Sequence, residues 1–578
     1  MRPTRTPFSR RNIIATGAAA LTLGAAVTAF TIGAPDQRDR SADLAAHIDP
    51  SKPRNVILLI GDGTDDSIIT AARNYELGAD GRFPALDEMP FTGDMTTHGL
   101  KVGDGPDYPI AYVSDSAPTA SAWSTGRKTV DGRLSQGPSV AATTPGEDYP
   151  TVLEILRDQG KRTGNVSTAE ITDATPAAAG AHINARACQG PTDMATCVSA
   201  MKSNGGRGSI SEQLVDNRID VILGGGHNRY VQPTDAGPTV LEYAQDELGY
   251  RYIGDPAGVS TAADLDAVTS LDDGPVIGLF TPGNMTPRYK PLVATAPPGA
   301  GGPAQRCEDA DLGSQPTLEQ MTAKAIDLLD NPDGFFLQVE SAMVDKQEHA
   351  SDICGSIGDV AELDRALQVA LDYQQANPDT LIIVTSDHAH STQIVPGPTS
   401  GKQTATLLTA DGDPMSVAFS TQDVGSSHTG TQVRVAAKGP QASNVTGLID
   451  QTELFSIMLG REPSTLPVET VTTTVTETVT APPVTVTVPA PTPAPRIGVR
   501  VQRSISAKNL QRHGLPVRVE AKGAHRIEVK LTRGRHTLAS SWLNGRGGVA
   551  VLRTKASRGN AVVEVTASGP GGRRSTTE

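Results

Sequence analysis

The chain has 578 residues, of which 37% are hydrophobic and 20% are charged. This is the composition of an ordinary soluble protein. The chain is too long for a single small domain, and its length allows one domain with a large core and a smaller unit in addition. The formal net charge of −14 is unevenly spread: residues 496–578 hold 17 Lys and Arg against 4 Asp and Glu, whereas residues 1–495 hold 33 against 60. An acidic body with a basic tail indicates two modules with different partners.

The N-terminal segment predicts export. It opens with basic residues, places Arg10 beside Arg11, and continues with an apolar stretch rich in Ala, Gly and Thr, which resembles a twin-arginine signal. A membrane anchor is the alternative, since residues 13–34 are long enough to span a bilayer. We expect a signal peptide over residues 1–34, cleaved near 29–34, and a protein that is secreted, periplasmic or associated with the cell wall.

Four cysteines suit an oxidising compartment, in which disulfides persist. They are Cys188, Cys197, Cys307 and Cys354. Three connectivities are open, but the short spacing of the first two favours pairing them, which leaves the other two as a second bridge. Because none lies in a C-x-x-C pair, a zinc–thiolate site is not expected, and any metal must be held by His and carboxylate groups.

Residues 50–462 form the first predicted domain. Short apolar runs alternate there with helical periodicity, which is the pattern of an α/β fold with a large, mostly parallel sheet flanked by helices. A helix is predicted by apolar residues at three- and four-residue steps from Ile357 to Leu371, and Asn377-Pro378 ends it. Buried strands are expected at 55–60, 219–225, 335–340 and 381–386.

Two further segments complete the chain. Residues 463–495 are rich in Pro, Thr and Val and lack a pattern that could bury a core, which predicts a stiff, extended linker. Residues 496–578 alternate apolar and polar positions between Gly-rich breaks, which predicts a small β-sandwich or a similar antiparallel module. The basic charge of this module favours a polyanion, such as a cell-wall polymer, as its partner, without specific nucleic-acid recognition; a spacer or stability domain is the alternative.

Acids and imidazoles follow three of the predicted strands of the larger domain. Asp62 comes after the first strand, Asp345 and His349 follow the third, and Asp387 and His388 follow the fourth. In open α/β sheets, ligands bind outside the carboxyl ends of the strands. We therefore expect these side chains to meet at one edge of the sheet.

The residue types and spacing at this edge favour two kinds of cation site. Asp345 and His349 are four residues apart, so on a helix they share one face and can hold one cation. A set of carboxylates and imidazoles suits zinc, whereas an all-oxygen set such as Asp62, Thr175 and Glu340 suits magnesium.

Several motifs together resemble those of bacterial alkaline phosphatases of the type with two zinc ions and one magnesium ion. The resemblance extends over nearly all of residues 50–460, and the motifs occur in the order of that family. It implies the alkaline phosphatase-like fold, hydrolysis of phosphate monoesters through a phosphoserine, two Zn²⁺ and one Mg²⁺ per subunit, the family's two disulfides and a homodimer. The segments that carry it are NVILLIGDG, YVSDSAPTASAWSTG, TGNVSTAEITDATPAAAGAHINAR, GSISEQLVDNRIDVILGGG, FFLQVESAMVDKQEHA, LIIVTSDHAHSTQIV and SHTGTQVRVAAKGP.

The same resemblance implies a role for each site residue. Ser116 would be the nucleophile, and Arg186, oriented by Asp115, would clamp two phosphate oxygens. Lys346 would reach the phosphate through a water and pair with a magnesium ligand, and His390 would support a zinc ligand. The implied metal ligands are Asp345, His349 and His428 for the first zinc, Asp387, His388 and Asp62 for the second, and Asp173, Thr175, Glu340 and the shared Asp62 for magnesium.

Three other functions are alternatives. A phosphodiesterase or sulfatase of the same superfamily would share the metal ligands, but Arg186 favours a dianionic monoester. A phosphate-binding protein without activity would tolerate loss of a ligand or of the nucleophile, and every expected position is filled. A surface-binding protein, with the tail as its main function, is compatible with catalysis.

Two features depart from the bacterial relatives. Asp65 and Asp66 stand where those relatives carry other residues, and they add negative charge near the site. Pro118 replaces a smaller residue two positions after Ser116. If the serine begins a helix, a proline in the first turn is tolerated, because the N–H groups there lack partners within the helix.

Overall fold

The structure is a computed structural model of the chain, and it divides into two compact units, Met1–Glu462 and Pro463–Glu578. No helix in the described part is both long and apolar enough to cross a membrane. The predicted signal (1–34) and linker (463–495) lie outside the described residues. These are 39–297, 300–398, 402–422, 425–461, 496–501, 510–511, 513–522, 526–533, 536–544, 547–554, 562–569 and 572–577.

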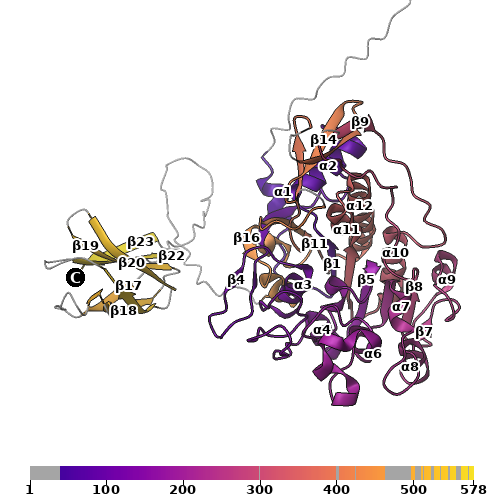
Figure 1. Cartoon of the computed structure of the whole chain (residues 1–578), viewed down its shortest axis with the longest axis horizontal. Helices are drawn as coiled ribbons and strands as arrows, with labels where there is room; N and C mark the ends of the chain where they lie inside the picture. Colours follow the sequence, from indigo (N-terminus) through magenta and orange to yellow (C-terminus); the bar gives the residue numbers. More distant parts are fainter. Residues whose placement is uncertain are drawn as a thin grey trace, which may run out of the picture. The chain divides into compact units, whose positions relative to one another are not determined.

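A ten-stranded sheet forms the centre of the larger unit (Figure 1). Neighbouring strands are parallel throughout, except that β15 is antiparallel to both β11 and β2. The predicted fold class, with a mostly parallel sheet, is confirmed. In spatial order the strands are β16 (Gly447–Asp450), β2 (Phe91–Thr96), β15 (Val433–Lys438), β11 (Thr380–Ser386), β1 (Asn55–Gly61), β10 (Phe335–Ser341), β5 (Arg162–Glu170), β6 (Val221–Gly225), β8 (Val276–Leu279) and β7 (Arg251–Tyr252).

The three central strands, β11, β1 and β10, are buried along their whole length. Apolar side chains of β1 alternate between two hydrophobic clusters: Val56 and Leu58 belong to one, and Ile57 and Leu59 belong to the other. A parallel sheet covered on both faces needs apolar residues at successive positions. This is why these strands are evident in the sequence as continuous apolar runs.

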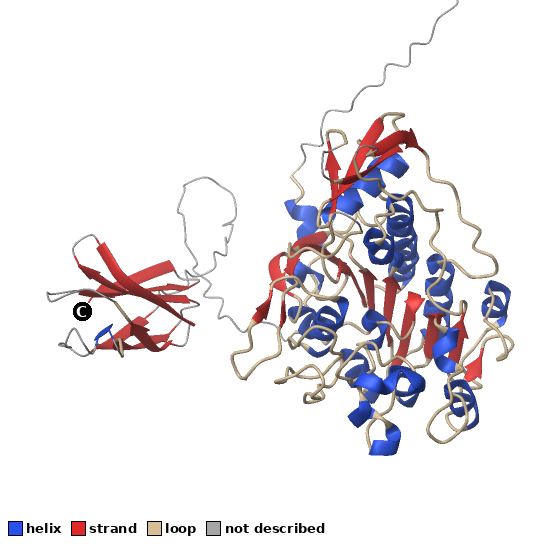
Figure 2. Ribbon diagram, viewed as in Figure 1, coloured by secondary structure: helices blue, strands red, loops and turns tan. Residues whose placement is uncertain are grey.

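Helices cover both faces of the sheet (Figure 2). The helix predicted at 357–371 is the central part of α12, which begins after the N-cap Asp352 and ends at Ala376, just before Asn377. The α-helices are α1 (Ser41–Ala46), α2 (Asp66–Leu77), α3 (Ser116–Thr125), α4 (Val152–Asp158), α5 (Ala174–Ala177), α6 (Ile210–Asp216), α7 (His227–Tyr230), α8 (Val240–Asp246), α9 (Ala262–Ala267), α10 (Leu318–Leu329), α11 (Met343–His349), α12 (Ile353–Ala376) and α13 (Glu453–Met458). Short 3₁₀ helices are η1 (Pro191–Thr196), η2 (Val198–Ala200), η3 (Lys202–Asn204) and η4 (Ala442–Val445).

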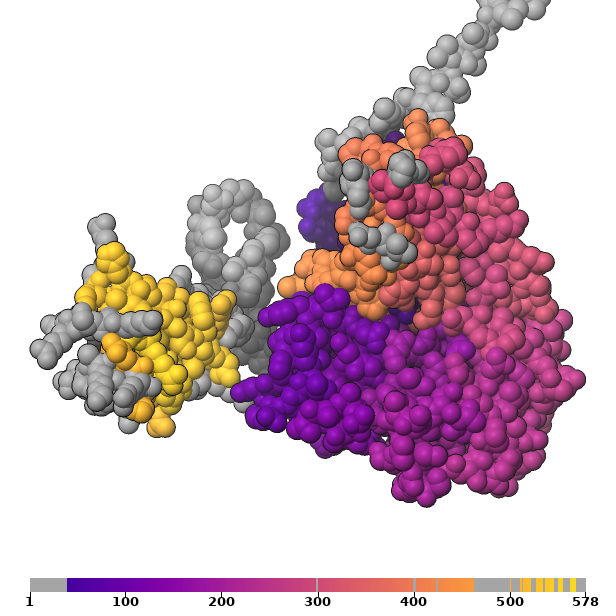
Figure 3. Space-filling view, viewed as in Figure 1, coloured from indigo at the N-terminus to yellow at the C-terminus, as the bar shows by residue number. Residues whose placement is uncertain are grey.

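Segments from the two ends of this unit lie side by side. β16 pairs in parallel with β2, and Leu454 and Ile457 of α13 share a hydrophobic cluster with Ala120 and Trp123 of α3. In the space-filling view, orange residues from the end of the unit accordingly lie against indigo and purple residues from its beginning (Figure 3). The last part of the unit therefore supports the helix that carries Ser116.

Two smaller sheets and two disulfides complete this unit. The disulfides are Cys188–Cys197 and Cys307–Cys354, which confirms the predicted pairing. The smaller sheets, which we did not predict, are β12 (Thr392–Val395), β14 (Pro414–Phe419), β13 (Gln403–Leu408) and β9 (Gly301–Gln305) in spatial order, and β3 (Gly99–Leu100) with β4 (Ile110–Ala111).

The C-terminal unit consists of a three-stranded and a four-stranded antiparallel sheet. Val517 and Val519 of the first share one buried cluster with Ile527 and Val529 of the second, so the two sheets enclose a core of their own. This confirms the predicted all-β module, although β20 and β23 were missed. The strands are β17 (Arg496–Val501), β18 (Leu515–Lys522) and β21 (Gly547–Leu552), then β20 (His536–Asn544), β19 (Arg526–Arg533), β22 (Val562–Gly569) and β23 (Gly572–Thr577).

Candidate active site

The carboxyl ends of β1, β10 and β11 meet at one level of the large sheet. Gly61, the last residue of β1, pairs in register with Ser341 of β10 and with Ser386 of β11. Asp62 and Asp387 are the next residues of their strands, so the parallel register alone places their carboxylates together. The sequence prediction that these strand ends form one site agrees with this arrangement.

Ser116 occupies the N-terminus of α3, with Asp115 as the N-cap residue. Its side chain is buried, with 3% of the residue exposed, and its Oγ lies 3.3 Å from Nε2 of His388. Pro118 stands in the first turn, where it interrupts no hydrogen bond of the helix. A buried hydroxyl at a helix N-terminus is well placed for an anion, because free N–H groups point toward it.

Arg186 connects two carboxylates beside this serine. Its Nη1 donates to Oδ1 of Asp115 at 2.7 Å, and its Nη2 donates to Oδ1 of Asp173 at 2.5 Å. Lys346 Nζ donates to the other oxygen of Asp173 at 2.6 Å. Burial would raise the pKa of Asp173, but the charges of Arg186 and Lys346 outweigh it and hold the pKa well below its usual range. The guanidinium is therefore fixed in direction by two ionised groups.

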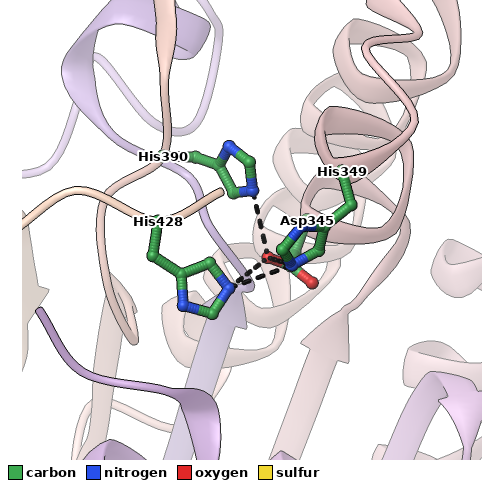
Figure 4. A group of neighbouring side chains, drawn as sticks. All are labelled: Asp345, His349, His390 and His428. Carbon is green, nitrogen blue, oxygen red and sulfur yellow. Dashed lines mark hydrogen bonds and ion pairs between the residues drawn. The ribbon is translucent and has the colours of Figure 1, made fainter. Parts of the chain in front are cut away.

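The first candidate metal cluster consists of three imidazoles around Asp345 (Figure 4). Oδ1 of Asp345 lies 3.2 Å from Nε2 of His428, 3.4 Å from Nε2 of His349 and 3.6 Å from Nε2 of His390. Asp345 and His349 lie one turn apart on the same face of α11, as their spacing predicts. His390, expected only to support a ligand, is thus only slightly farther from Asp345 than the expected ligands His428 and His349 are.

The ring orientations of two of these histidines are set by backbone carbonyls. Nδ1 of His349 lies 2.8 Å from the carbonyl oxygen of Ser426, and Nδ1 of His428 lies 3.0 Å from that of Ser114. A carbonyl only accepts, so each Nδ1 carries a proton, and in the neutral ring the lone pair is then on Nε2. Both Nε2 atoms then face the cluster in the form that binds a metal.

The second candidate cluster is formed by Asp62, Asp345 and His388. Nε2 of His388 lies 3.5 Å from Oδ1 of Asp62 and 3.2 Å from Oδ2 of Asp387. Burial raises the pKa of Asp62, and the charges of Asp387 and Asp345 raise it further. Several carboxylates buried around one imidazole are unfavourable without a cation.

Unpartnered oxygen atoms show that these residues fit metal ions. Among the described residues, four buried oxygens at expected ligand positions have no hydrogen-bond partner: Oδ1 of Asp62, Oγ1 of Thr175, Oδ1 of Asp345 and Oδ2 of Asp387. Buried polar atoms are normally satisfied. Mixed imidazole and carboxylate donors suit zinc, and the hydroxyl and carboxylate donors suit magnesium.

Besides Asp62, which follows β1, the residues expected for magnesium come from two adjacent strands, β10 and β5, and the chain after β5. Glu340 lies near the end of β10, opposite Ser167 of β5, and the chain after β5 leads to Asp173 and Thr175. Ser167 donates a hydrogen bond to Glu340. Burial raises the pKa of Glu340 to about 7. The groups around this carboxyl therefore do not fully stabilise its ionised form.

Two functional neighbours were missed by the sequence reasoning. Glu348 is fully buried, accepts a hydrogen bond from Thr392 and has its other oxygen 3.7 Å from Nδ1 of His390. A charged residue beside His349 on the predicted helix was the available signal for it. Ser167 had no such signal, because only the pairing of β5 with β10 brings it to Glu340.

The two extra aspartates after Asp62 bind protein groups. Asp65 is the N-cap of α2 and accepts from the N–H groups of Ser67 and Ile68. Burial raises its pKa to about 6. Asp66 forms a 2.9 Å ion pair with Arg434.

Comparison with known proteins identifies the family. The model of the alkaline phosphatase family matches residues 53–425. The chain belongs to the alkaline phosphatase family. Alkaline phosphatase H of Pseudomonas aeruginosa is 46% identical over 433 residues, which cover 72% of this chain and 87% of the relative. Alkaline phosphatase of Escherichia coli is 45% identical, with 73% and 88% covered. Among solved structures, alkaline phosphatase from the Antarctic bacterium TAB5 aligns with a TM-score of 0.51 at 22% identity, over 71% of this chain and 97% of that one, a likeness of fold.

Proposed function

We propose that this alkaline phosphatase hydrolyses phosphate monoesters through a phosphoserine at Ser116. The observation that carries the proposal is the position of this hydroxyl, which is buried at the N-terminus of α3 and 3.3 Å from His388. Arg186, fixed by Asp115 and Asp173, would bind two non-bridging oxygens of the substrate. A group that binds two non-bridging oxygens favours a monoester over a diester, because a diester has fewer non-bridging oxygens.

The proposed reaction consists of two in-line displacements. In the first, Ser116 Oγ gives up its proton and forms a bond to phosphorus while the bond from phosphorus to the leaving alcohol breaks, and the alcohol oxygen takes up a proton. In the second, water attacks phosphorus and loses a proton, the Oγ–P bond breaks, the serine oxygen takes up a proton to regenerate the hydroxyl, and inorganic phosphate is released. Arg186 and the N-terminus of α3 stabilise the charge on the phosphoryl oxygens in both steps.

The proposed cofactors are two Zn²⁺ and one Mg²⁺. Bound at this edge of the sheet, they would lower the pKa of the serine hydroxyl and of water and stabilise charge on the entering and leaving oxygens. The first zinc would be held by Asp345, His349 and His428, with His390 close enough to be a fourth ligand. The remaining proposed ligands are Asp62, Asp387 and His388 for the second zinc, and Asp62, Asp173, Thr175 and Glu340 for magnesium.

The test of the nucleophile compares two serines of α3. Ser116→Ala should lower kcat for an aryl phosphate by about 10³-fold or more. Ser124→Ala is the matched control, because Ser124 is buried on the same helix and its hydroxyl has no hydrogen-bond partner among the described residues. Equal activity of the two variants would refute the proposed nucleophile.

Metal dependence is tested separately from the nucleophile. A chelator should abolish activity and lower the thermal midpoint, because it leaves buried carboxylates without a cation. Zinc together with magnesium should restore both. Activity that survives exhaustive chelation, with no metal found by elemental analysis, would contradict the proposed cofactors.

Two further proposals concern the state of the protein in its host. We propose export through the twin-arginine signal, supported by Arg10 and Arg11 and by two disulfides, and a homodimer, supported by family membership. Arg10→Lys with Arg11→Lys should keep the protein in the cytoplasm, as judged by cell fractionation. Sedimentation should give twice the chain mass; a monomer at micromolar concentration would exclude a stable dimer.

A further inference from the structure

The C-terminal unit has two sheets, and their described basic side chains differ in whether they have a partner within the unit. Its 83 residues from 496 onward carry 17 Lys and Arg against 4 Asp and Glu.

The three-stranded sheet exposes apolar and basic side chains together. Val517 and Val519 of β18 are buried, whereas Arg518 between them is exposed. Val549 and Val551 of the neighbouring β21 are 49% and 45% exposed. Arg518 lies opposite Val549, and Pro516 opposite Val551. We call this surface the basic face, defined by the exposed residues Pro516, Arg518, Val549, Val551 and Arg553.

More basic residues occupy neighbouring register positions. Arg500 of β17 pairs with Arg518, and Arg496 pairs with Lys522. Glu520 is the one acidic residue within these three strands. Among the described residues, no ion pair is found for Arg518 or Arg553. The basic face therefore has positive charge that the unit itself does not neutralise.

The described lysine and arginine side chains of the four-stranded sheet, those of Arg526, Lys530 and Arg533, already have partners. The guanidinium of Arg526 stacks on the ring of Trp542, with 3.8 Å from Cζ to the ring centroid. Lys530 Nζ forms a 2.8 Å ion pair with Glu528, and Lys530 lies opposite Glu564 in the register. The strands of this sheet hold five Lys and Arg against two Asp and Glu, the same net excess as those of the three-stranded sheet, so it serves as an internal control for charge alone.

We infer that the basic face binds an acidic polysaccharide. Guanidinium groups match carboxylates geometrically, and exposed Val549, Val551 and Pro516 can pack against the C–H faces of sugar rings. Single-stranded nucleic acid fits less well, because such ligands need aromatic stacking platforms. Trp542 is the single aromatic residue of 496–578, and it lies on the other sheet. This inference goes beyond the catalytic proposal and does not depend on it.

The test measures binding of the full chain to carboxymethyl dextran, with uncharged dextran as the matched probe. The full chain should bind the carboxymethylated polymer at low ionic strength, be released by salt and ignore plain dextran. Arg518→Glu with Arg553→Glu should weaken binding by about tenfold or more, because like charges then face each other. Circular dichroism and thermal unfolding of each preparation are measured in parallel as evidence that the C-terminal unit is folded.

Arg526→Glu with Lys530→Glu is the matched control, since it makes the same charge change on the other sheet. This variant should bind nearly as well as the unchanged chain. Equal losses in the two double variants would show attraction by net charge alone and overturn the assignment to the basic face. Absence of binding at low salt, or tighter binding to duplex DNA than to carboxymethyl dextran, would also overturn the inference.

Discussion

Arg186 illustrates how individual charges define the site. Its guanidinium donates hydrogen bonds to both Asp115 and Asp173, and Lys346 donates to the other carboxylate oxygen of Asp173. Charges of opposite sign raise the pKa of Arg186 despite its burial. The group proposed to bind the phosphate is therefore held in one orientation before substrate binds, which lowers the entropy cost of binding.

Replacing Arg186 tests this fixed geometry. Arg186→Ala should lower kcat/KM for an aryl phosphate by about 10²–10³-fold, because an oriented charge is lost. Arg186→Lys keeps the charge but loses the planar guanidinium, so its activity should fall between that of Arg186→Ala and that of the unchanged enzyme. Steady-state kinetics measure both. A lysine variant as active as the unchanged enzyme would show that charge alone matters here.

α4 and its surroundings show how a helix cap is coupled to a buried ion pair. Thr151 and Glu154 form a capping box at the start of α4. Oε1 of Glu154 also lies 2.9 Å from Nε2 of His182, whose Nδ1 faces the carbonyl of Ser135 at 3.0 Å. Burial opposes both charges, but the mutual hydrogen bond outweighs it: the pKa of Glu154 falls to about 2, and the pKa of His182 rises.

This pair predicts a pH window of added stability. The lowered pKa of Glu154 stabilises the fold above its ordinary value of 4.5, and this contribution is lost as the pH falls toward 2. The raised pKa of His182 stabilises the fold below 6.5, and this contribution is lost as the pH rises through the folded pKa. The ion pair is therefore strongest between these two ordinary values.

Glu154→Gln tests this window. At pH 6 it should lower the free energy of unfolding by about 2 kcal/mol, the scale of a hydrogen bond to a charged group, and at pH 9 by clearly less. Glu242→Gln is the matched control, because Glu242 forms the same capping box with Thr239 on α8. Thermal unfolding at both pH values is the measurement. An equal loss for Glu154→Gln at pH 6 and pH 9 would contradict the role of His182.

The two disulfides constrain loops of different length. Cys307–Cys354 joins residues 47 positions apart and encloses β10 and α11, which carry Glu340 and Asp345. Cys188–Cys197 joins residues only 9 positions apart. Loop-closure entropy predicts a loss of about 4 kcal/mol on removing the first bridge and about 2.5 kcal/mol on removing the second. Paired Cys→Ser variants, compared by chemical unfolding, measure this; an equal or reversed order would contradict the loop-length argument.

The whole chain consists of two units with separate cores. The larger unit contains all the site residues discussed above, and the C-terminal unit has its own buried cluster. A chain that ends at residue 462 should therefore keep kcat/KM within about twofold, since separate domains fold around their own cores. Kinetics of this shortened chain measure the effect. A tenfold loss would show that the C-terminal unit contributes to catalysis.

Predictability from sequence differed between parts of the chain. The predicted strand at 55–60 corresponds to β1, which extends only one residue further, because a strand buried on both faces is a continuous apolar run. β20 alternates poorly, with partly exposed side chains along its length, and it was missed. β9 was missed as well, since four of its five residues are exposed. Such strands are held by their neighbours more than by their own pattern.

The sequence by itself determined which chemical groups are available and where they stand along the strands. Asp62, Asp387 and His388 follow buried parallel strands, and the spacing of Asp345 and His349 fits one helical face; these are local patterns. They are enough to place metal-binding groups at one edge of a sheet.

Only the tertiary structure decided how those groups are oriented. The fork of Arg186 between two carboxylates, the backbone carbonyls that set the imidazole rings, and the Ser167 hydroxyl on Glu340 all join residues far apart in the chain. Asp65 and Asp66, which were expected to add negative charge near the site, also bind protein groups: one caps α2 and the other pairs with Arg434. Such contacts depend on strand register and helix packing, which no local pattern of residues specifies.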